Sequence, residues 1–570
     1  MNKEHKKGDK KEKILNFRDL ISKRYQKFEE RTAFKYKEKG EIQEITYKKY
    51  IQDIKALGTA ILNLDVKRVA LIGNNRYEWA TSYLAATTAG VIIIPLDKAL
   101  TDKEIEKLVK RSGAEAIIYE EKYQNAVNEC MKEGCNLQYK ICMDNIEKED
   151  TIKYRDLLKQ GQELVERQDN RYDKVQIDEN EMYIMLFTSG TTNEPKAVML
   201  SQKNICENLN AISEHVKINC NDTLLSFLPI HHTFECTITF LYGTYSGATI
   251  AFCEGLKYIA QNLKDYKVTV FVAVPLVLET MYKKIQKGIE ESGKKDLIDK
   301  MIKISNGLLK CKIDLRKILF KPVTKQFDEY LRVVLYGAAP MDKNTIMGYD
   351  NLGITLVQGY GLTETSPVVA AEKENKRRAG SIGVPLNNVE VKIDNPDKDG
   401  VGELLVKGPN VMLGYYKNEE ATKKAIDGEW LHTGDFAYID KDGFIFITGR
   451  QSDIIVLRNG KNIYPQEIEF LINKLPYVEE SMVYSRNKTK TDTLLCAKIV
   501  YSKENLQKQF GEKTEKQYQD LIWKDIKEMN KELPTYKHIK EIKLTDQPFE
   551  KTTTQKVKRF VEINKIKENA

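Results

Sequence analysis

The stretch RVALIGNNRYEWATSYLAATTAGVIIIPLDKALTDKEIEKLVKRSGAEAIIYE, residues 68–120, decides the fold class of this chain. It contains three apolar, strand-like segments, separated by two segments whose length and apolar spacing are helical. Strands that are apolar throughout are typical of a parallel sheet covered on both faces, and the crossovers between them are right-handed. Thr101 and Glu104 have the spacing of a helix capping box. We therefore predict a βαβαβ unit.

The same pattern returns after a polar, charged stretch near residues 145–180. A second α/β layer, with a helix from about Gln202, is predicted by four apolar segments: YIMLFT (183–188), AVMLS (197–201), TVFVAVP (269–275) and RVVLYG (332–337). Beyond Gly380, short alternating segments with turn residues predict a small β-rich or barrel subdomain. After Arg450 the chain restarts as a smaller α+β unit, so residues 449–453 are a candidate domain boundary.

Composition places the chain among soluble multidomain proteins. Of its residues, 41% are hydrophobic and 31% are charged. Its length of 570 residues predicts roughly two to four domains. The basic start leads into an amphipathic segment and not into a secretory signal, so we expect a cytoplasmic protein. The nine cysteines form no CxxC pair, which disfavours a disulfide framework and structural zinc. The uncharged stretch from Cys236 to Cys253 is predicted to be a buried strand-turn-strand, not a membrane span.

The segment Thr188-Ser-Gly-Thr-Thr-Asn-Glu-Pro-Lys196 follows directly on an apolar strand. Its hydroxyls, glycine and lysine suit a loop around polyphosphate, because small residues let backbone N–H groups approach the oxygens and the lysine supplies charge. It is not a Walker A loop, since no Gly-Lys-Ser/Thr follows at the required spacing. An ordinary Ser/Thr-rich surface turn would explain the segment if it stood alone.

Further stretches carry groups that suit a nucleotide. Gln358-Gly-Tyr-Gly-Leu-Thr-Glu-Thr365 combines an aromatic ring that can stack on a purine with hydroxyls and a carboxylate that can hold Mg²⁺. Gly337-Ala-Ala-Pro340 ends a strand with small residues, against which a flat ring can lie. Thr433-Gly-Asp435 offers a carboxylate for a ribose diol, and Gly449-Arg450 adds a cation. An ordinary turn would explain any single one of them.

Together these motifs resemble the adenylate-forming superfamily of acyl-CoA synthetases, luciferases and nonribosomal adenylation domains, in order and spacing over nearly the whole chain. FTSGTTNEPKAVMLS is similar to its phosphate loop, LPIHHTFE to its acid-site histidine motif, GYGLTET to its adenine and Mg²⁺ motif and HTGD to its ribose motif. GRQSDIIVLRNGKNIYPQEIE is similar to its hinge, and KTTTQKVKR to its C-terminal lysine motif. Six motifs thus occur in the order of the family.

The resemblance implies an α/β fold with two domains. The large N-terminal domain, residues 1–449, would contain two doubly wound α/β subdomains and a small β-barrel subdomain. A small mobile α+β domain, residues 450–570, would swing about a hinge at 449–453, with Ser452 or Asp453 as the pivot.

The resemblance also implies a role for each matching residue. Thr188 and Glu364 would hold Mg²⁺, and His232 would position or gate the acyl carboxylate, although a satisfied core histidine would explain His232 as well. Lys556 would bridge this carboxylate and the α-phosphate. The contacts to ATP would be Ser189, Gly190, Thr191, Thr192 and Lys196 at the pyrophosphate, Gly337, Ala338, Ala339 and Tyr360 at the adenine, Thr363 at the α-phosphate, Asp435 at the ribose, and Arg450 at the ribose or phosphate.

The reaction implied is activation of a fatty acid by ATP as an acyl-adenylate, followed by acyl transfer to coenzyme A. A carboxylate that attacks the α-phosphorus meets like charge, so the site needs cations and hydroxyls where charge accumulates. HTFE, NGKNIYPQEIE and the basic helical insert near 281–325 resemble the long-chain fatty acid branch. The chain departs from the family pattern at Asn193, Ala197 and Gln555, where glycine is usual, and at Leu276, where that branch commonly has arginine.

Three alternatives stay open. An acyl-carrier protein could replace coenzyme A as the acceptor, and a luciferase-like oxygenase would share the adenylation site. A non-catalytic acyl- or nucleotide-binding protein is the alternative from another class. It is disfavoured by the charged residues that the chain keeps: Lys196, Glu364, Asp435, Arg450 and Lys556.

Basic residues gather between Lys283 and Lys325 with few acidic ones, although the net charge of the whole chain is only +8. Apolar residues recur there at helical spacing. One interpretation is a solvated helical face, and the other is a surface that contacts anionic membrane lipid and collects fatty acid from it. We expect no nucleic-acid partner, and oligomers are compatible with the sequence.

Overall fold

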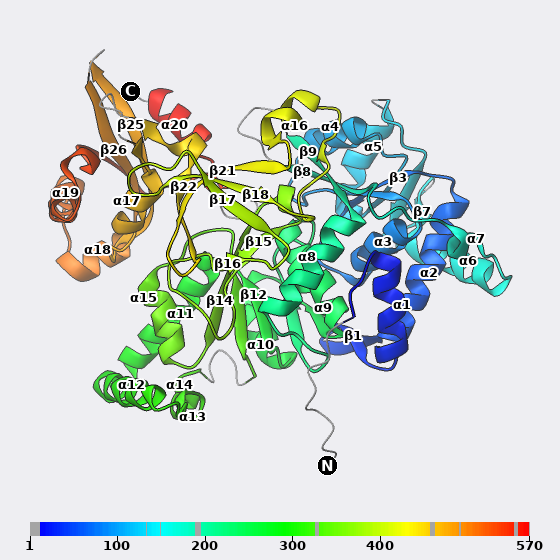
Figure 1. The fold of residues 1–570 in the computed structure, drawn as a ribbon, viewed down its shortest axis with the longest axis horizontal. Helices are drawn as coiled ribbons and strands as arrows, with labels where there is room; N and C mark the ends of the chain where they lie inside the picture. Colours follow the sequence, from blue (N-terminus) through cyan, green and yellow to red (C-terminus); the bar gives the residue numbers. More distant parts are fainter. Residues whose placement is uncertain are drawn as a thin grey trace. The chain divides into compact units, whose positions relative to one another are not determined.

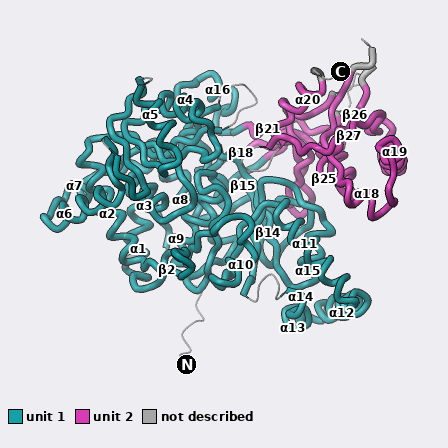
Figure 2. Tube along the Cα trace, turned by 180° about the vertical axis from the view of Figure 1, so that it is seen from behind, with its two compact units in different colours: residues 1–391, 406–431 teal, residues 392–405, 432–570 magenta. Residues whose placement is uncertain are grey.

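The computed structural model describes residues 12–132, 134–148, 150–188, 195–324, 330–456, 462–489, 492–551 and 557–568. The contacts within it divide the chain into two compact units (Figure 2). Unit 1 comprises residues 1–391 and 406–431, and unit 2 comprises residues 392–405 and 432–570. No helix among the described residues has both the length and the apolar composition needed to cross a membrane.

The first quoted stretch forms the centre of an eight-stranded sheet in unit 1, in the order β19-β9-β8-β4-β3-β5-β6-β7 (Figure 1). The predicted βαβαβ unit is confirmed, because β3 pairs in parallel with both β4 and β5. The Thr101–Glu104 capping box is present at the start of the second connecting helix. The elements are β3 (Arg68–Ile72), α3 (Tyr77–Thr88), β4 (Ile92–Pro95), α4 (Asp102–Ser112), β5 (Ala116–Tyr119), β6 (Tyr139–Cys142), β7 (Ile152–Lys153), β8 (Met182–Thr188), β9 (Lys196–Ser201) and β19 (Gly414–Tyr415).

A nine-stranded sheet is the second layer of unit 1, in the order β16-β15-β14-β13-β12-β10-β11-β1-β2. The predicted strands β8 and β9 are not part of it, because Ile184 of β8 pairs in parallel with Ile93 of β4, and β9 folds back antiparallel on β8. Its strands are β1 (Thr32–Glu38), β2 (Glu41–Thr46), β10 (Thr223–Ser226), β11 (Thr249–Phe252), β12 (Val270–Ala273), β13 (Val333–Tyr336), β14 (Thr355–Gly361), β15 (Val368–Ala371) and β16 (Val384–Pro385).

Helices cover these sheets, and one segment differs from its prediction. The stretch Cys236–Cys253 is buried but is not strand-turn-strand, since it contains most of a π-helix, Glu235–Leu241, then α9 and β11. Phe240 packs edge-on against Trp79 and Tyr83 of α3, so tertiary packing overrides the β-propensity of its Thr and Ile residues. The remaining helices of unit 1 are α1 (Phe17–Phe28), α2 (Tyr47–Asn63), α5 (Gln124–Lys132), α6 (Tyr154–Glu166), α7 (Arg171–Lys174), α8 (Gln202–His215), α9 (Tyr242–Ser246), α10 (Ile259–Asp265), α11 (Pro275–Glu291), α12 (Lys295–Lys310), α13 (Arg316–Leu319), α14 (Lys321–Thr324), α15 (Lys343–Asn351) and α16 (Glu419–Ala425).

The predicted β-rich part is a five-stranded sheet, and the predicted α+β part follows it. The chain passes between the units within β17, β18 and β21, whereas the predicted boundary at 449–453 stays a prediction. The five strands are β17 (Glu390–Asp394), β18 (Gly402–Lys407), β20 (Ile426–Asp427), β21 (Trp430–Ile439) and β22 (Ile445–Arg450). The α+β part contains β23 (Ile455–Val456), β24 (Asn462–Ile463), α17 (Pro465–Ile472), β25 (Val478–Thr489), β26 (Asp492–Tyr501), α18 (Lys503–Phe510), α19 (Glu515–Lys531), β27 (Glu541–Thr545) and α20 (Arg559–Glu568).

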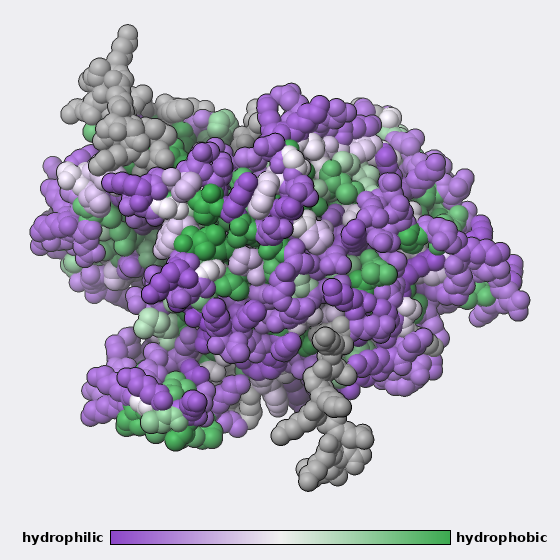
Figure 3. Space-filling model, in the orientation of Figure 1, coloured by the Kyte–Doolittle hydropathy of each residue, from purple (hydrophilic) through white to green (hydrophobic). Residues whose placement is uncertain are grey.

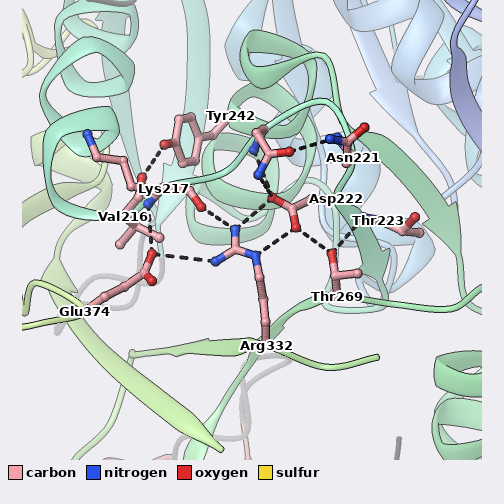
Figure 4. A network of polar contacts seen from close by, with 10 residues as sticks. Val216, Lys217, Asn221, Asp222, Thr223, Tyr242, Thr269, Arg332 and Glu374 are labelled. Atoms are coloured by element: carbon pink, nitrogen blue, oxygen red, sulfur yellow. Dashed lines mark hydrogen bonds and ion pairs between the residues drawn. The ribbon is translucent and has the colours of Figure 1, made fainter. Parts of the chain in front are cut away.

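A polar network joins the amino ends of the parallel strands β10, β12 and β13 (Figure 4). Arg332 donates two hydrogen bonds to Asp222, at 2.8 Å and 2.7 Å, and Thr269 donates a third at 2.8 Å. Glu374 lies 3.7 Å from the same guanidinium. Burial alone would raise the pKa of Asp222, but the bonds from Arg332 and from the backbone of Asn219 hold it below its usual value. This network leaves the carboxyl ends of the strands for ligands.

Candidate active site

The predicted phosphate loop connects two paired strands. Thr188 ends β8 and lies opposite Lys196 at the start of β9, and its hydroxyl donates to the Lys196 carbonyl at 3.4 Å. Ser189, Gly190, Thr191, Thr192 and Asn193 lie outside the described residues. Ala197, where the family usually has glycine, is 1% exposed and packs in the apolar core beneath β9. This departure is therefore accommodated by the sheet.

Lys196 and Glu364 are brought together by a residue that sequence reasoning missed. The ring of Tyr415 lies under the ammonium group of Lys196, 4.8 Å from Nζ to the ring centroid. The Tyr415 hydroxyl donates to Glu364 Oε1 at 3.0 Å, and burial, followed by the Glu364 charge, raises the pKa of this hydroxyl. Tyr415 reaches this position because β19 pairs with β9 and the Met412 N–H donates to the Glu364 carbonyl at 2.9 Å. The Gly-Tyr-Tyr sequence at 414–416 was the available signal.

Glu364 lies in a 3₁₀-helix, Thr363–Thr365, that follows directly on β14. Thr363 therefore stands at the carboxyl end of that strand, as the predicted contact to an α-phosphate requires. The described residues contain no group of three or more His, Cys, Asp or Glu arranged to hold a metal. A carboxylate and a threonine hydroxyl fit Mg²⁺ all the same, because this ion usually takes one or two carboxylates and completes its shell with substrate phosphates and water.

The small residues of the predicted adenine site follow β13. A Cβ on Gly337 would lie 2.8 Å from the Gly359 carbonyl, so only glycine fits this close approach, and Ala338 has a φ of 69°. Tyr336 pairs in parallel with Gln358, and this register sets residues 337–339 beside Gly359 and Tyr360. The loop and the aromatic residue thus lie together at the carboxyl ends of β13 and β14 in the nine-stranded sheet.

The histidine motif lies next to this loop. The ring of Phe234 comes within 3.6 Å of a Cβ placed on Gly337, and the Phe234 N–H donates to Nδ1 of His232 at 3.3 Å. His231 faces Asp97 instead, with 3.5 Å between Nε2 and Oδ1. The structure therefore gives the two neighbouring histidines different partners.

Asn75, which no sequence motif marked, holds the histidine loop in place. Its amide group donates to the Leu228 carbonyl at 2.7 Å and to the Ser226 hydroxyl at 2.9 Å, and accepts from the Ile230 N–H at 3.2 Å. Asn75 and Asp97 both follow closely on parallel strands, β3 and β4. Polar residues at the carboxyl ends of strands were the signal that could have found them.

An apolar cavity of about 10 Å³ adjoins His231. Glu235 follows the histidines and is fully buried; burial, which outweighs hydrogen bonds from Ser226 and Thr239, raises its pKa to about 8. Its Oε2 accepts from the Thr239 hydroxyl at 2.9 Å.

The cavity beside His231 is lined by Tyr83, Pro95, Leu186, Leu200, Ile205, His231, Thr233, Cys236 and Thr237. Leu276, the altered position of the long-chain branch, is 46% exposed at the start of α11, so it is a surface residue.

Asp435 and Arg450 are partners within unit 2. They lie opposite one another in β21 and β22, and Arg450 Nε donates to Asp435 Oδ1 at 3.0 Å. Asp435 is 3% exposed, and its N–H donates to the Thr433 hydroxyl at 3.1 Å. The other described site residues belong to unit 1. Lys556 and Gln555 lie outside the described residues.

Two known protein families match the chain. Residues 21–416 match the AMP-binding enzymes, and residues 452–568 match the AMP-binding enzyme C-terminal domain. A long-chain-fatty-acid–[acyl-carrier-protein] ligase of Arabidopsis thaliana is 26% identical over 92% of this chain and 82% of the relative. A long-chain-fatty-acid–CoA ligase, FadD15, of Mycobacterium bovis is also 26% identical, over 77% of this chain and 75% of the relative.

A solved structure has the same fold. It is the O-succinylbenzoate coenzyme A synthetase MenE of Bacillus subtilis in complex with ATP and a magnesium ion, with a TM-score of 0.72. The alignment covers 95% of this chain and 98% of that chain at 20% sequence identity. At this identity the likeness concerns the fold alone.

Proposed function

The chain belongs to the family of AMP-binding enzymes, and we propose that it is an AMP-forming long-chain fatty acid–coenzyme A ligase. In the first half-reaction a carboxylate oxygen attacks the α-phosphorus of ATP, the bond to pyrophosphate breaks, and acyl-AMP forms. In the second, the thiolate of coenzyme A attacks the acyl carbonyl and AMP leaves. The two relatives, both named as long-chain fatty acid ligases, support the substrate class.

The observation that carries this proposal is the arrangement of Lys196, Tyr415 and Glu364 at the end of the β8–β9 hairpin. Lys196 places a positive charge beside the predicted pyrophosphate site, where charge develops as the bond to the α-phosphorus breaks. Thr188 and Glu364 would hold Mg²⁺, which neutralises phosphate charge when bound. Residues 337–339 and Tyr360 form the adenine side of the site.

The remaining roles rest on the family pattern. We assign the ribose hydroxyls to Asp435, which Arg450 holds through the 3.0 Å hydrogen bond. Lys556 bridges the acyl carboxylate and the α-phosphate, and the C-terminal domain turns about residues 449–453 between the half-reactions. His232 positions the acyl carboxylate, and the acyl chain enters beside it through the cavity at His231. Because that cavity holds about 10 Å³, its lining side chains must move to admit a chain.

The test is pyrophosphate release from ATP and Mg²⁺ with acids from acetate to oleate, with thioester products followed by mass. The proposal is supported if pyrophosphate release is greatest with long-chain acids and the enzyme turns over repeatedly only when coenzyme A is present. Turnover with acyl-carrier protein and not with coenzyme A would make the chain an acyl-carrier-protein ligase, as the Arabidopsis relative is named. Lys556→Ala should fold but form no acyl-adenylate. No release with any acid would refute the enzyme and favour a binding protein.

We also propose that this ligase contacts anionic membranes through the helices α12 and α13, which with α14 lie at one edge of unit 1 (Figure 1). Figure 3 shows an apolar area over these helices amid hydrophilic surface. Residues 294–324 carry nine basic and three acidic residues. The apolar patch consists of Leu297 (55% exposed), Ile304 (63%), Ile313 (47%), Leu315 (36%) and Ile318 (73%). Lysines around exposed apolar side chains are typical of interfacial helices.

Co-sedimentation with vesicles tests this contact. We expect binding to vesicles with one third phosphatidylserine and little binding to pure phosphatidylcholine, with a loss in salt because the lysines contribute. The double variant Ile304→Glu, Ile318→Glu should lose binding and keep pyrophosphate release in detergent-solubilised oleate. Leu256→Glu, at a residue that is 70% exposed elsewhere in unit 1, is the matched control. Equal binding by all three proteins would refute the surface.

A further inference from the structure

Three polar partners within unit 2 converge on Arg559, the first residue of α20. Its Nη2 group donates to Glu469 Oε2, and its Nη1 group donates to the Val483 carbonyl at 3.3 Å. Its Nε lies 3.4 Å from Asp453 Oδ2. Arg559 therefore joins β25, α17 and the segment 449–453 to a part of the chain that is distant from all three in sequence.

The partners differ in how firmly they hold Arg559. The Glu469 side chain is 10% exposed and also accepts from the Val483 N–H at 2.6 Å. A carboxylate so buried needs its cation, because the loss of one partner leaves an uncompensated buried charge. Asp453 is 18% exposed, its contact is longer, and water can replace Arg559 there. The pair with Glu469 is thus permanent, and the pair with Asp453 is exchangeable.

Segment 449–453 is in turn packed against the start of α17. Gln466 Nε2 donates to Asp453 Oδ2 at 2.5 Å. A Cβ on Gly449 would lie 2.8 Å from the Tyr464 ring and 3.1 Å from Gln466 Oε1. A rotation of the backbone within this segment would move the Asp453 carboxylate away from Gln466 and Arg559, while Arg559 would stay on Glu469.

We propose that Arg559 is a positioning residue whose exchangeable ion pair with Asp453 stabilises one setting of segment 449–453, the setting that serves acyl-adenylate formation. This inference rests on the proposed function. Lys556, assigned to that half-reaction, precedes Arg559 by three residues. Arg559 thus links the pivot to the chain that carries Lys556. Thioester formation, which uses the other setting of the hinge, does not need this pair.

The experiment measures the two half-reactions separately in the full-length protein. Acyl-adenylate formation is followed in a single turnover with ATP, Mg²⁺ and oleate, and thioester formation starts from synthetic oleoyl-AMP and coenzyme A. We expect Asp453→Asn and Arg559→Lys each to slow adenylation about tenfold, because each weakens the partly buried ion pair between the two side chains. Thioester formation should change less than twofold. The double variant should be no slower than either single variant, because both remove the same pair.

Arg486→Lys is the matched control, because Arg486 pairs with Glu541 at 2.6 Å in the same unit and touches no hinge residue in the described structure. It should leave the ratio of the two rates unchanged. Asp453→Asn keeps the Arg559–Glu469 pair, so a thermal midpoint like that of the parent shows that it folds. Equal slowing of both half-reactions, or effects that multiply in the double variant, would overturn the proposal. A parent enzyme without pyrophosphate release would instead refute the proposed function itself.

Discussion

Replacing Glu235 by glutamine should stabilise the protein, and increasingly so as the pH rises. Glu235 is fully buried beside the histidine motif, and burial raises its pKa to about 8 from the ordinary 4.5. In the unfolded chain the same carboxyl ionises near its ordinary value. Folding therefore requires that a proton be bound between these two pH values, whereas glutamine is neutral throughout and keeps an oxygen for the Thr239 hydroxyl.

The magnitude follows from proton linkage. A group whose pKa is raised on folding contributes stability at low pH that is lost as the pH rises through the folded-state value. Each unit of pH between 4.5 and 8 lowers the free energy of unfolding by about 1.4 kcal/mol. Relative to its value below pH 4.5, the free energy of unfolding of the parent protein should therefore be lower by about 3 kcal/mol at pH 7 and by about 5 kcal/mol above pH 8 through this one group. Glu235→Gln should remove this slope.

The assay is urea unfolding from pH 5 to 8.5, read by the fluorescence of Trp79. Trp79 of α3 is fully buried and contacts Phe240, which lies in the π-helix that also contains Glu235, with 6.3 Å between ring centroids. Replacing Trp430 and Trp523 by phenylalanine leaves this signal alone, because the chain has three tryptophans. Glu420→Gln, at an exposed residue of α16, is the matched control and should show no comparable slope.

The difference in unfolding free energy between Glu235→Gln and the parent should grow with pH and level off near pH 8. A difference that stays constant from pH 5 to 8.5 would mean that Glu235 is ionised in the folded protein. The argument from burial would then be wrong, because a nearby cation would have to compensate the charge.

Three further changes test other parts of the structure. Tyr415→Phe keeps the ring under Lys196 but removes the donor to Glu364, so adenylation should slow about tenfold, as single-turnover kinetics with ATP will show. Asp435→Asn breaks the charge pair with Arg450 and should raise the KM for ATP about tenfold with a smaller effect on kcat; an unchanged KM would contradict the ribose assignment. Arg332→Met leaves Asp222 buried without its cation and should lower the free energy of unfolding by about 3 kcal/mol, while the folded fraction stays active; calorimetry and specific activity measure the two.

The apolar strands and helical spacings predicted most of the α/β fold, because their periodicity depends on local sequence. Residues 68–120 form the predicted βαβαβ unit with its capping box. The sheet to which β8 and β9 belong could not be predicted, because it depends on a contact between Ile93 and Ile184 that is distant in sequence. The π-helix after Glu235 is helical through packing on α3, which no local propensity reports.

The motifs predicted residues that carry charge, and the structure adds those that hold them. Tyr415, Asn75 and Asp97 lie beside motif residues only because strands and loops bring them there. Their local signals, a Gly-Tyr-Tyr sequence and polar residues at strand ends, do not show which motif residue each one will contact. The pair of Asp435 with Arg450 was foreseeable in retrospect, since two short strands joined by a turn place their ends opposite one another.

Tyr415, at the end of β19, also separates the charges of Lys196 and Glu364. A lysine and a glutamate side by side would form an ion pair, and an incoming triphosphate would first have to break it. The Tyr415 ring face contacts Lys196, and the Tyr415 hydroxyl donates to Glu364. Lys196 and Glu364 thus lie near one another with Tyr415 as their shared partner. These three side chains are thus arranged in advance for a ligand that needs a cation and an anion at once, and little reorganisation remains when it binds.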